Sequence, residues 1–536
     1  MSKTFYLTTA IDYTNGPPHI GHAYEKVLAD VIARYHRLKG EKVYFLTGVD
    51  QHGQKVQQSA ERAGVSPQQF VDELTAKFIA LWEKLEIRYD GWAATTDPLH
   101  KRCVQGMLQR LYDEGEIYKD KQEGYYSIRQ EQFLTEKERG PDGEFGPEWG
   151  EVEHRIEENY YFRLIKHKEW LLSHLRSHPH CITPEFRQAE LINALEKLTG
   201  DLCISRPKSR LSWGIELPFD RDYVNYVWFD ALTNYISFIG YDPSKSYADQ
   251  SSAFLEKWPA LHIIGKDILV PAHGIYWPIM LHALGFPDEG TPTFLVHGWW
   301  NVSGTKMSKS LGNVIDPAAL ADKYGAAPLR YYLIEAMVVG QDTDFSEEQM
   351  LTRFNSALAN SIGNLLSRTL TMIWKYRAGK VRQIRSDDER LTTCRTLIQT
   401  EITGYLKAFG DGKNEDSFVA HSIDEAAHHA LMSSWHANHL IENTQPYKLA
   451  KNEDGSELLD AILYTLTESL RIIAILLSPI LPTAAHGIFD QLNWKMELRG
   501  KEQRFSLGEA EWGKLPDGQL VGRPTPLFPR IQADAA

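Results

Sequence analysis

The sequence predicts an α/β protein in which a parallel-sheet domain is split by an α+β insert and followed by an all-α helix bundle. Three observations support this prediction. A strand–helix–strand pattern opens the chain, aromatic and charged residues mix with Gly-Pro breaks in the middle, and helical periodicity dominates after residue 351. A length of 536 residues suits three or four structural units of roughly 100–200 residues each.

The N-terminal region carries the signature of a nucleotide-binding type of sheet. A buried strand is expected at 5–9, a helix starts near Gly21, and Gly40 stands where a helix C-cap belongs. A second strand at 42–47 leads into Asp50. Strand, helix and strand make a βαβ unit, which predicts a parallel sheet with its ligands at the carboxyl ends of the strands.

The remaining elements follow from local pattern. Further buried strands are expected at 261–264 and 293–296, and Gly- and Pro-poor helical stretches at 354–377, 423–441 and 458–477 predict the bundle. The expected boundaries are 1–115 for the first half of the α/β domain, 116–224 for the insert, 225–325 for the second half, 326–350 for a linker, 351–500 for the bundle and 501–536 for an irregular tail.

Composition excludes several classes of protein. Hydrophobic residues make up 43% and aromatic residues 11% of the chain, which argues against disorder. The net charge of −13 argues against a nucleic-acid coat, although local Lys and Arg can still bind RNA. Four cysteines without a C-x-x-C pair, no signal sequence, and aliphatic runs no longer than 472–477 predict a cytoplasmic protein that does not enter a membrane.

The first chemical motif is His19-Ile20-Gly21-His22, at the predicted strand-to-helix turn. A helix N-terminus offers free N–H groups and a partial positive charge, both of which suit phosphate. Gly21 lets a flat ligand lie close to the backbone, and the two imidazoles can donate to phosphate oxygens. For an isolated pair, two surface histidines that cap a helix would be the commoner explanation.

The second motif is Lys306-Met307-Ser308-Lys309-Ser310, between Gly304 and Gly312. The ammonium groups of Lys306 and Lys309 can neutralise charge on a triphosphate as it reorganises. A solvated basic loop is the alternative for this pentapeptide taken alone.

Together the two motifs resemble those of the class I aminoacyl-tRNA synthetases, and further segments narrow the resemblance to the methionyl-tRNA synthetase family. Those segments are 10–13, 49–53, 159–164 and 226–231, and the resemblance extends from Thr4 to about Ile531. It implies a Rossmann-like catalytic domain split by a connective insert, a linker at 326–350 that contacts the tRNA stem, and a helix-bundle domain that binds the anticodon.

The resemblance implies a two-step reaction. ATP and L-methionine form methionyl-adenylate and pyrophosphate, and the methionyl group then passes to a ribose hydroxyl at the 3′ end of initiator or elongator tRNA(Met). Mg²⁺ would accompany ATP, and positioning with charge stabilisation suffices, so that no covalent enzyme intermediate is needed. The implied catalytic residues are His19, His22, Lys306 and Lys309, and the ATP site adds Gly21 and Asp267.

The amino-acid pocket also follows from the resemblance. Asp50 resembles the carboxylate that pairs with the substrate ammonium. A polarizable thioether packs well on aromatic rings, where sulfur contacts add about 0.3–1.5 kcal/mol. The implied thioether pocket consists of Ile11, Tyr13, Trp228, Leu232, Tyr235 and His273. Plain core packing is the alternative for Trp228 and Tyr235, and the stretch from Asp267 to Trp277 is one residue longer than the family pattern.

One departure from the family concerns metal. Many relatives carry Cys-rich zinc knuckles in the insert, whereas no cysteine lies between Cys103 and Cys181 here. Phe145, Pro147 and Trp149 stand in the later stretch instead. We therefore predict an insert without zinc, held by aromatic packing; one zinc per purified chain would contradict this.

The resemblance also points to anticodon contacts. Asn364 and Arg368 lie four apart on one helical face, as the family's contacts do. A base that leaves its loop typically stacks on an aromatic ring. The family usually places Trp after the Pro of a segment like 443–446, and this chain has Tyr447 there. The alternative for Tyr447 is a cap on the core.

We expect the protein to be a monomer.

Two other functions compete with this one. A leucyl, isoleucyl or valyl enzyme would carry a much longer insert than 116–224, and a cysteinyl enzyme would need zinc-binding cysteines in its active site. The other competitor is a catalytically inactive relative that only binds tRNA. The presence of both histidines and both lysines in the two motifs opposes that alternative.

Overall fold

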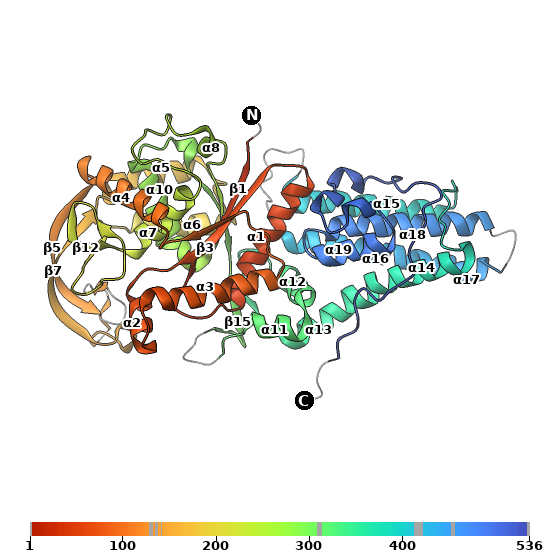
Figure 1. The fold of residues 1–536 in the computed structure, drawn as a ribbon, viewed down its shortest axis with the longest axis horizontal. Coiled ribbons are helices and arrows are strands. Elements are labelled where there is room, and N and C mark those ends of the chain that lie inside the picture. Colours follow the sequence, from red (N-terminus) through yellow and green to blue (C-terminus); the bar gives the residue numbers. More distant parts are fainter. Residues whose placement is uncertain are drawn as a thin grey trace.

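The structure, a computed structural model, describes residues 3–127, 132–134, 138–140, 142–307, 313–411, 422–451 and 456–532. The molecule is elongated, with the sheets at one end and a helical bundle at the other (Figure 1). None of the helices in these described ranges is long and apolar enough to cross a membrane.

The main sheet is parallel throughout and runs in the order β3-β1-β13-β14 at its centre. These strands are β1 (Phe5–Thr9), β3 (Val43–Asp50), β13 (Leu261–Gly265) and β14 (Thr293–His297). Strand order reverses between β1 and β13, because the first half of the domain extends one way from β1 and the second half the other way. Ligands of such sheets bind at this switch point, outside the carboxyl ends of the strands.

Three short strands complete the main sheet. β2 (Asp12–Tyr13) and β4 (Gly91–Ala94) pair with β3, and β8 (Ile182–Thr183) pairs with β14. β8 belongs to segment 116–224, so a strand from the expected insert extends the catalytic sheet at its edge. Two residues are too few to predict from sequence, since only the pairing with Phe294 and Leu295 makes them a strand.

Helix α1 (Ile20–Leu38) covers β1 and β3 because one of its faces is apolar. Val27, Val31 and Tyr35 are fully buried on that face. The chain leaves the helix through Gly40, whose φ of +85° is easy only for glycine. The other helices of this half are α2 (Gln54–Ala63), α3 (Pro67–Lys84), α4 (Pro98–Asp113), α7 (Val227–Ser237), α10 (Trp277–Ala283), α11 (Pro317–Tyr324) and α12 (Ala326–Glu335).

The insert contains a separate antiparallel sheet. Long strands β5 (Ile117–Ser127) and β7 (Val152–Phe162) pair along their whole length, flanked by β6 (Gln132–Leu134) and β9 (Leu202–Cys203). Helices α5 (Lys168–Ser177) and α6 (Glu185–Glu196) follow. The Arg139 guanidinium lies over the rings of Tyr125 and Phe145. Within the described residues no group of three His, Cys, Asp or Glu could hold a metal ion; the absence of zinc stays a prediction.

The C-terminal half is a helix bundle with α14 (Asn364–Arg377), α15 (Glu389–Ala408), α16 (Ile423–Thr444), α18 (Ser456–Leu477) and α19 (Pro482–Gln491). A π-helix at Phe354–Gly363 continues α13 (Glu347–Arg353) into α14. The sequence did not predict α15. The tail returns along the bundle, where Trp374 Nε1 donates to Gly522 O at 2.7 Å.

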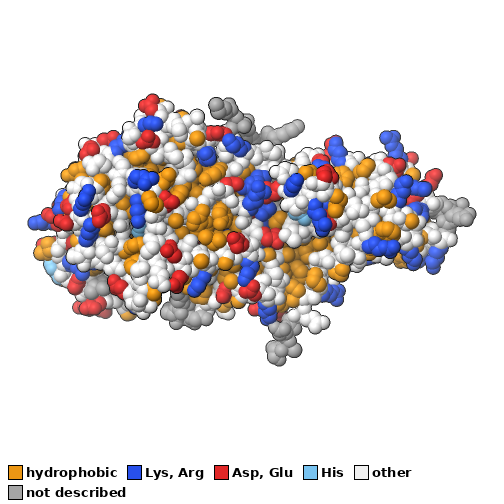
Figure 2. Space-filling view, viewed as in Figure 1, with side chains coloured by type: hydrophobic (Ala, Val, Ile, Leu, Met, Phe, Trp, Pro, Cys, Tyr) orange, Lys and Arg blue, Asp and Glu red, His pale blue; other side chains and the backbone are white. Residues whose placement is uncertain are grey.

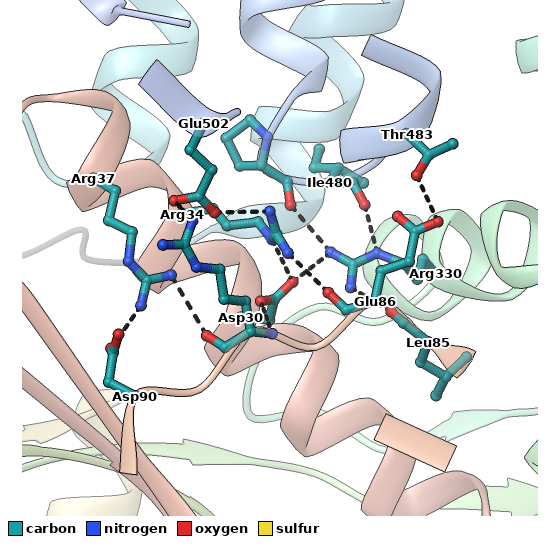
Figure 3. Close-up of polar contacts among 12 residues, drawn as sticks. Asp30, Arg34, Arg37, Leu85, Glu86, Asp90, Arg330, Ile480, Thr483 and Glu502 are labelled. Atoms are coloured by element: carbon teal, nitrogen blue, oxygen red, sulfur yellow. Dashed lines mark hydrogen bonds and ion pairs between the residues drawn. The ribbon is translucent and has the colours of Figure 1, made fainter. Parts of the chain in front are cut away.

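A buried polar junction joins the two ends of the molecule (Figure 3). The fully buried guanidinium of Arg330 donates to Asp30 Oδ2, Leu85 O and Ile480 O, each at 2.8 Å. Asp30 lies on α1, Leu85 ends α3, and Ile480 lies between α18 and α19. Arg34 donates to the same Asp30 oxygen at 2.8 Å. Helix α1 and the bundle are therefore held together by one ion-pair network.

Candidate active site

A cavity of about 490 Å³ opens at the carboxyl ends of the central strands, at the switch point. It brings together twelve of the thirteen predicted catalytic, ATP-binding and methionine-binding residues: Ile11, Tyr13, His19, Gly21, His22, Asp50, Trp228, Leu232, Tyr235, Asp267, His273 and Lys306. The thirteenth, Lys309, lies outside the described residues.

The two histidines of the first motif form the N-terminal cap of α1. His19 Nδ1 accepts the N–H of Gly21 at 3.1 Å, and His22 Nδ1 accepts the N–H of His19 at 3.1 Å. Since each Nδ1 accepts, a neutral ring carries its proton on Nε2. The rings stack with centroids 3.8 Å apart. Helix capping and phosphate donation are thus compatible, because they use different nitrogens of each ring.

Gly21 has a local reason to lack a side chain. A Cβ at this position would lie 3.0 Å from His19 Cε1, closer than side chains normally pack. Gly21 also lines the cavity, and its close approach to a flat ligand stays a prediction.

A lysine and a tryptophan line the side of the cavity near the second motif. Lys306 Nζ lies 3.6 Å from the centroid of the Trp299 ring and 3.7 Å from Asp267 Oδ2. Both Lys306 and Asp267 are about half exposed, so they remain accessible to a ligand in the cavity. Trp299 was not predicted as a site residue.

Asp50 ends β3 and is buried beside a second carboxylate. Its Oδ1 accepts the N–H of His52 at 3.3 Å and the Thr95 hydroxyl at 3.4 Å. Burial, and then the charge of Asp230, raise the pKa of Asp50 well above its usual range. Asp230 is itself held by His52 and His100 at 2.6 and 2.7 Å. No ion pair joins Asp50 to any cation among the described residues, so a cationic ligand beside it would favour the charged carboxylate.

Tyr235 and His273 form the polar end of the apolar pocket. The His273 Nδ1 lies 3.0 Å from the carbonyl of Ile268, so Nδ1 carries the proton and Nε2 accepts the Tyr235 hydroxyl at 2.7 Å. Burial lowers the pKa of His273 to about 4, which keeps the ring neutral near pH 7. His273 lies in a π-helix, Leu269–Tyr276, and such a turn accommodates an additional residue.

The sequence did not predict a buried charged network in the wall of the cavity. Lys26 Nζ donates to Asp12 Oδ1 at 2.7 Å, Glu25 Oε1 at 2.9 Å and Ala10 O at 2.8 Å. Glu25 Oε2 in turn meets His297 Nε2 at 3.1 Å. Glu25 lies one helical turn after His22, and this spacing was the signal in the sequence that Glu25 could belong to the site. Its partner His297 lies 272 residues away, and no local pattern connects the two residues.

The predicted anticodon residues lie far along the chain from this cavity, on the bundle. Asn364 begins α14 and is exposed, Arg368 follows one turn later and is half-buried, and Tyr447 on α17 (Pro446–Leu449) is 47% exposed. Tyr447 is therefore accessible for stacking, and its anticodon role stays a prediction.

Sequence comparison identifies the family. A model described as tRNA synthetases class I (M) matches residues 5–142 and 149–370. A methionine--tRNA ligase of Deinococcus radiodurans is 40% identical over 99% of this chain and 75% of its own length. The chain belongs to the methionyl-tRNA synthetase family. A methionine--tRNA ligase of Thermosynechococcus vestitus, 39% identical, is covered over 98% of its length.

Solved methionyl-tRNA synthetases share the fold. The enzyme of Mycobacterium tuberculosis in complex with methionyl-adenylate superposes with a TM-score of 0.88 at 35% identity, covering 98% of this chain and all of that one. The apo form of that enzyme gives a TM-score of 0.83 at 32% identity. The predicted split α/β domain followed by a helical domain is confirmed, and another class I specificity is not favoured.

Proposed function

We propose that this chain is a methionine--tRNA ligase, which uses ATP to attach L-methionine to tRNA(Met) in two steps and so supplies both initiation and elongation of translation. One observation carries the proposal. A single cavity at the switch point contains the buried carboxyl of Asp50, which has no ion pair with a described residue, together with an apolar pocket and the helix end of His19 and His22, which suits phosphate. That combination fits an amino acid whose carboxylate meets the α-phosphate of ATP.

In the first step a methionine carboxylate oxygen attacks the α-phosphorus and pyrophosphate leaves. Asp50 holds the ammonium, while Trp228 and Leu232 face the thioether. The Nε2–H groups of His19 and His22 donate to phosphate oxygens, and Lys306 neutralises the charge that shifts to pyrophosphate. Lys309 would add a second cation there. Mg²⁺ enters with ATP as part of the substrate.

In the second step a ribose hydroxyl of the terminal adenosine attacks the methionyl carbonyl, and AMP leaves. The bundle holds the other end of the tRNA, with Asn364 and Arg368 on base edges and Tyr447 as the stacking platform. Figure 2 shows lysine and arginine side chains gathered over the outer end of the bundle, which supports contact with RNA despite the acidic total. The monomeric state and the cytoplasmic location stay predictions.

A two-stage labelling experiment tests both steps. Enzyme mixed with ATP and radiolabelled methionine should form labelled methionyl-adenylate without tRNA, and added tRNA(Met) should take up the label at its 3′ end. Absence of adenylate would refute the first step. If adenylate forms but neither initiator nor elongator tRNA(Met) takes up the label, the second step is refuted. That result would support the alternative of a relative that binds tRNA without charging it.

A further inference from the structure

The segment from Ala10 to Tyr13 forms one wall of the substrate cavity. It follows β1, includes β2, and carries Ile11 and Tyr13 of the proposed methionine pocket. Directly after it, Thr14 donates its N–H and its hydroxyl to Asp50 O, both at 2.9 Å. The segment thus lies against the residue that we assign to the substrate ammonium.

Lys26 of α1 holds this segment through a buried ammonium group. Its side chain is fully buried, and its three N–H donors meet three acceptors. Nζ donates to Ala10 O at 2.8 Å, to Asp12 Oδ1 at 2.7 Å and to Glu25 Oε1 at 2.9 Å. Every donor of the ammonium is therefore engaged by the protein, and none is left for a substrate.

Lys26 also lies on the same face of α1 as the first motif. It follows His22 by four residues, which places the two side chains one helical turn apart. The ammonium therefore links the helix end that suits phosphate to the segment that carries the methionine pocket. These two parts need a fixed separation if a methionine carboxylate oxygen is to meet the α-phosphorus of ATP in line.

The contact between Lys26 and Asp12 is shielded from water, with the two side chains 0% and 2% exposed. Burial raises the pKa of Asp12 to about 7, although Lys26 opposes the rise. Oδ2 of Asp12 is buried and has no hydrogen-bond partner among the described residues. A neutral carboxyl can carry its proton on Oδ2 and still accept at Oδ1. The hydrogen bond from Lys26 therefore does not depend on the charge of Asp12.

We propose that Lys26 and Asp12 are positioning residues for adenylate formation, because their contact fixes segment 10–13 relative to the helix end of His19 and His22. This inference rests on the proposed function, since a reaction between an amino acid and ATP is what requires the two parts at a fixed separation. A misplacement of about 1 Å can slow such a reaction about 100-fold, and buried groups behind a site set its geometry. The competing explanation is an ion pair that only stabilises the fold.

Substitutions at Asp12 separate these two explanations. Asp12→Asn removes the charge and keeps an acceptor for Lys26, whereas Asp12→Leu removes both. In ATP–pyrophosphate exchange, Asp12→Leu should lose about 10- to 100-fold in kcat/KM for methionine, while the KM for ATP stays within about twofold. Asp12→Asn should stay within about threefold of the wild type, because the hydrogen bond is kept. Equal losses in both variants, or a higher KM for both substrates in Asp12→Leu, would overturn the proposal.

A double variant keeps the test valid if Asp12→Leu lowers stability. Replacing both partners of a buried ion pair by apolar residues is often neutral for stability. Asp12→Leu combined with Lys26→Met should therefore recover the melting temperature that the single variant loses. Its kcat/KM for methionine should stay at least as low, because Ala10 O has also lost its donor. Recovery of methionine activity together with the melting temperature would assign the pair to stability alone and refute the proposal.

Glu401→Leu is the matched control on the bundle. Glu401 pairs with His429 at 2.7 Å and with His436 at 2.9 Å, and its side chain is 14% exposed. Its loss should lower the melting temperature without changing the KM for methionine. A selective rise in that KM in the control would contradict the positioning role. If the wild-type enzyme shows no methionine-dependent exchange, the proposed function itself fails.

Discussion

Arg330 connects helix α1 to the bundle through buried hydrogen bonds, and replacing it tests how much this connection stabilises the protein. Replacing it by Met removes hydrogen bonds to Asp30 Oδ2, Leu85 O and Ile480 O, all at 2.8 Å, and a fourth to Pro479 O at 3.1 Å. Asp30 would remain buried with only the Arg34 guanidinium and the N–H of Arg88.

The expected loss follows from these contacts. Breaking a buried pair by removing one partner costs about 3–5 kcal/mol, and each carbonyl left without a donor adds about 1–3 kcal/mol where water cannot reach it. Because Arg34 still pairs with Asp30, the ion-pair contribution is reduced, and the total loss is expected to be at least about 3–5 kcal/mol. That is a large part of a typical stability of about 5–15 kcal/mol.

Urea unfolding followed by circular dichroism measures this loss. Arg330→Met should show a clearly lower midpoint, whereas Arg499→Met, at an ion pair whose arginine is 67% exposed, should lose no more than about 1 kcal/mol. Equal midpoints for the two variants would refute the reasoning that the junction holds the two ends together.

Three further predictions concern the sites. His22→Ala should slow adenylate formation about 10²- to 10³-fold, since one donor to the transition state is lost, while filter-binding affinity for tRNA stays unchanged; unaltered exchange would remove His22 from catalysis. Tyr447→Ala should cost charging about 1–3 kcal/mol in kcat/KM, the value of one stacked base, and spare exchange; equal losses in both assays would argue against the anticodon role. Because burial and Asp230 raise the pKa of Asp50, lowering the pH should neutralise this carboxyl and raise the KM for methionine. In Asp50→Asn the KM should be high at every pH, and a pH profile like that of the wild type would contradict the assignment.

Local pattern was enough for the elements with a strong apolar period. Strand Phe5–Thr9 and helix Ile20–Leu38 lie where the sequence predicted them. Helix Glu389–Ala408 was missed because it is rich in threonine, a weak helix former, and buries only a sparse set of side chains. Its helicity depends on packing against α16 and α18, which one sequence does not display.

The residues of the candidate site likewise divide into those that the sequence predicted and those that it did not. Asp50 and the two histidines belong to contiguous motifs, so the sequence could nominate them and the structure brings them into one cavity. Lys26, Asp12 and His297 act through contacts that only the folded sheet creates. The contact between Arg206 and the Tyr226 ring is likewise a product of the insert docking on the catalytic domain.

Methionine-dependent ATP–pyrophosphate exchange, measured without tRNA across all twenty amino acids, tests the central claim most directly. Exchange with methionine alone is the predicted result, because Asp50, the apolar pocket and the phosphate-binding helix end act together in the first step. Exchange driven by a different amino acid would contradict the pocket assignment, and exchange with none would contradict the proposed activity itself.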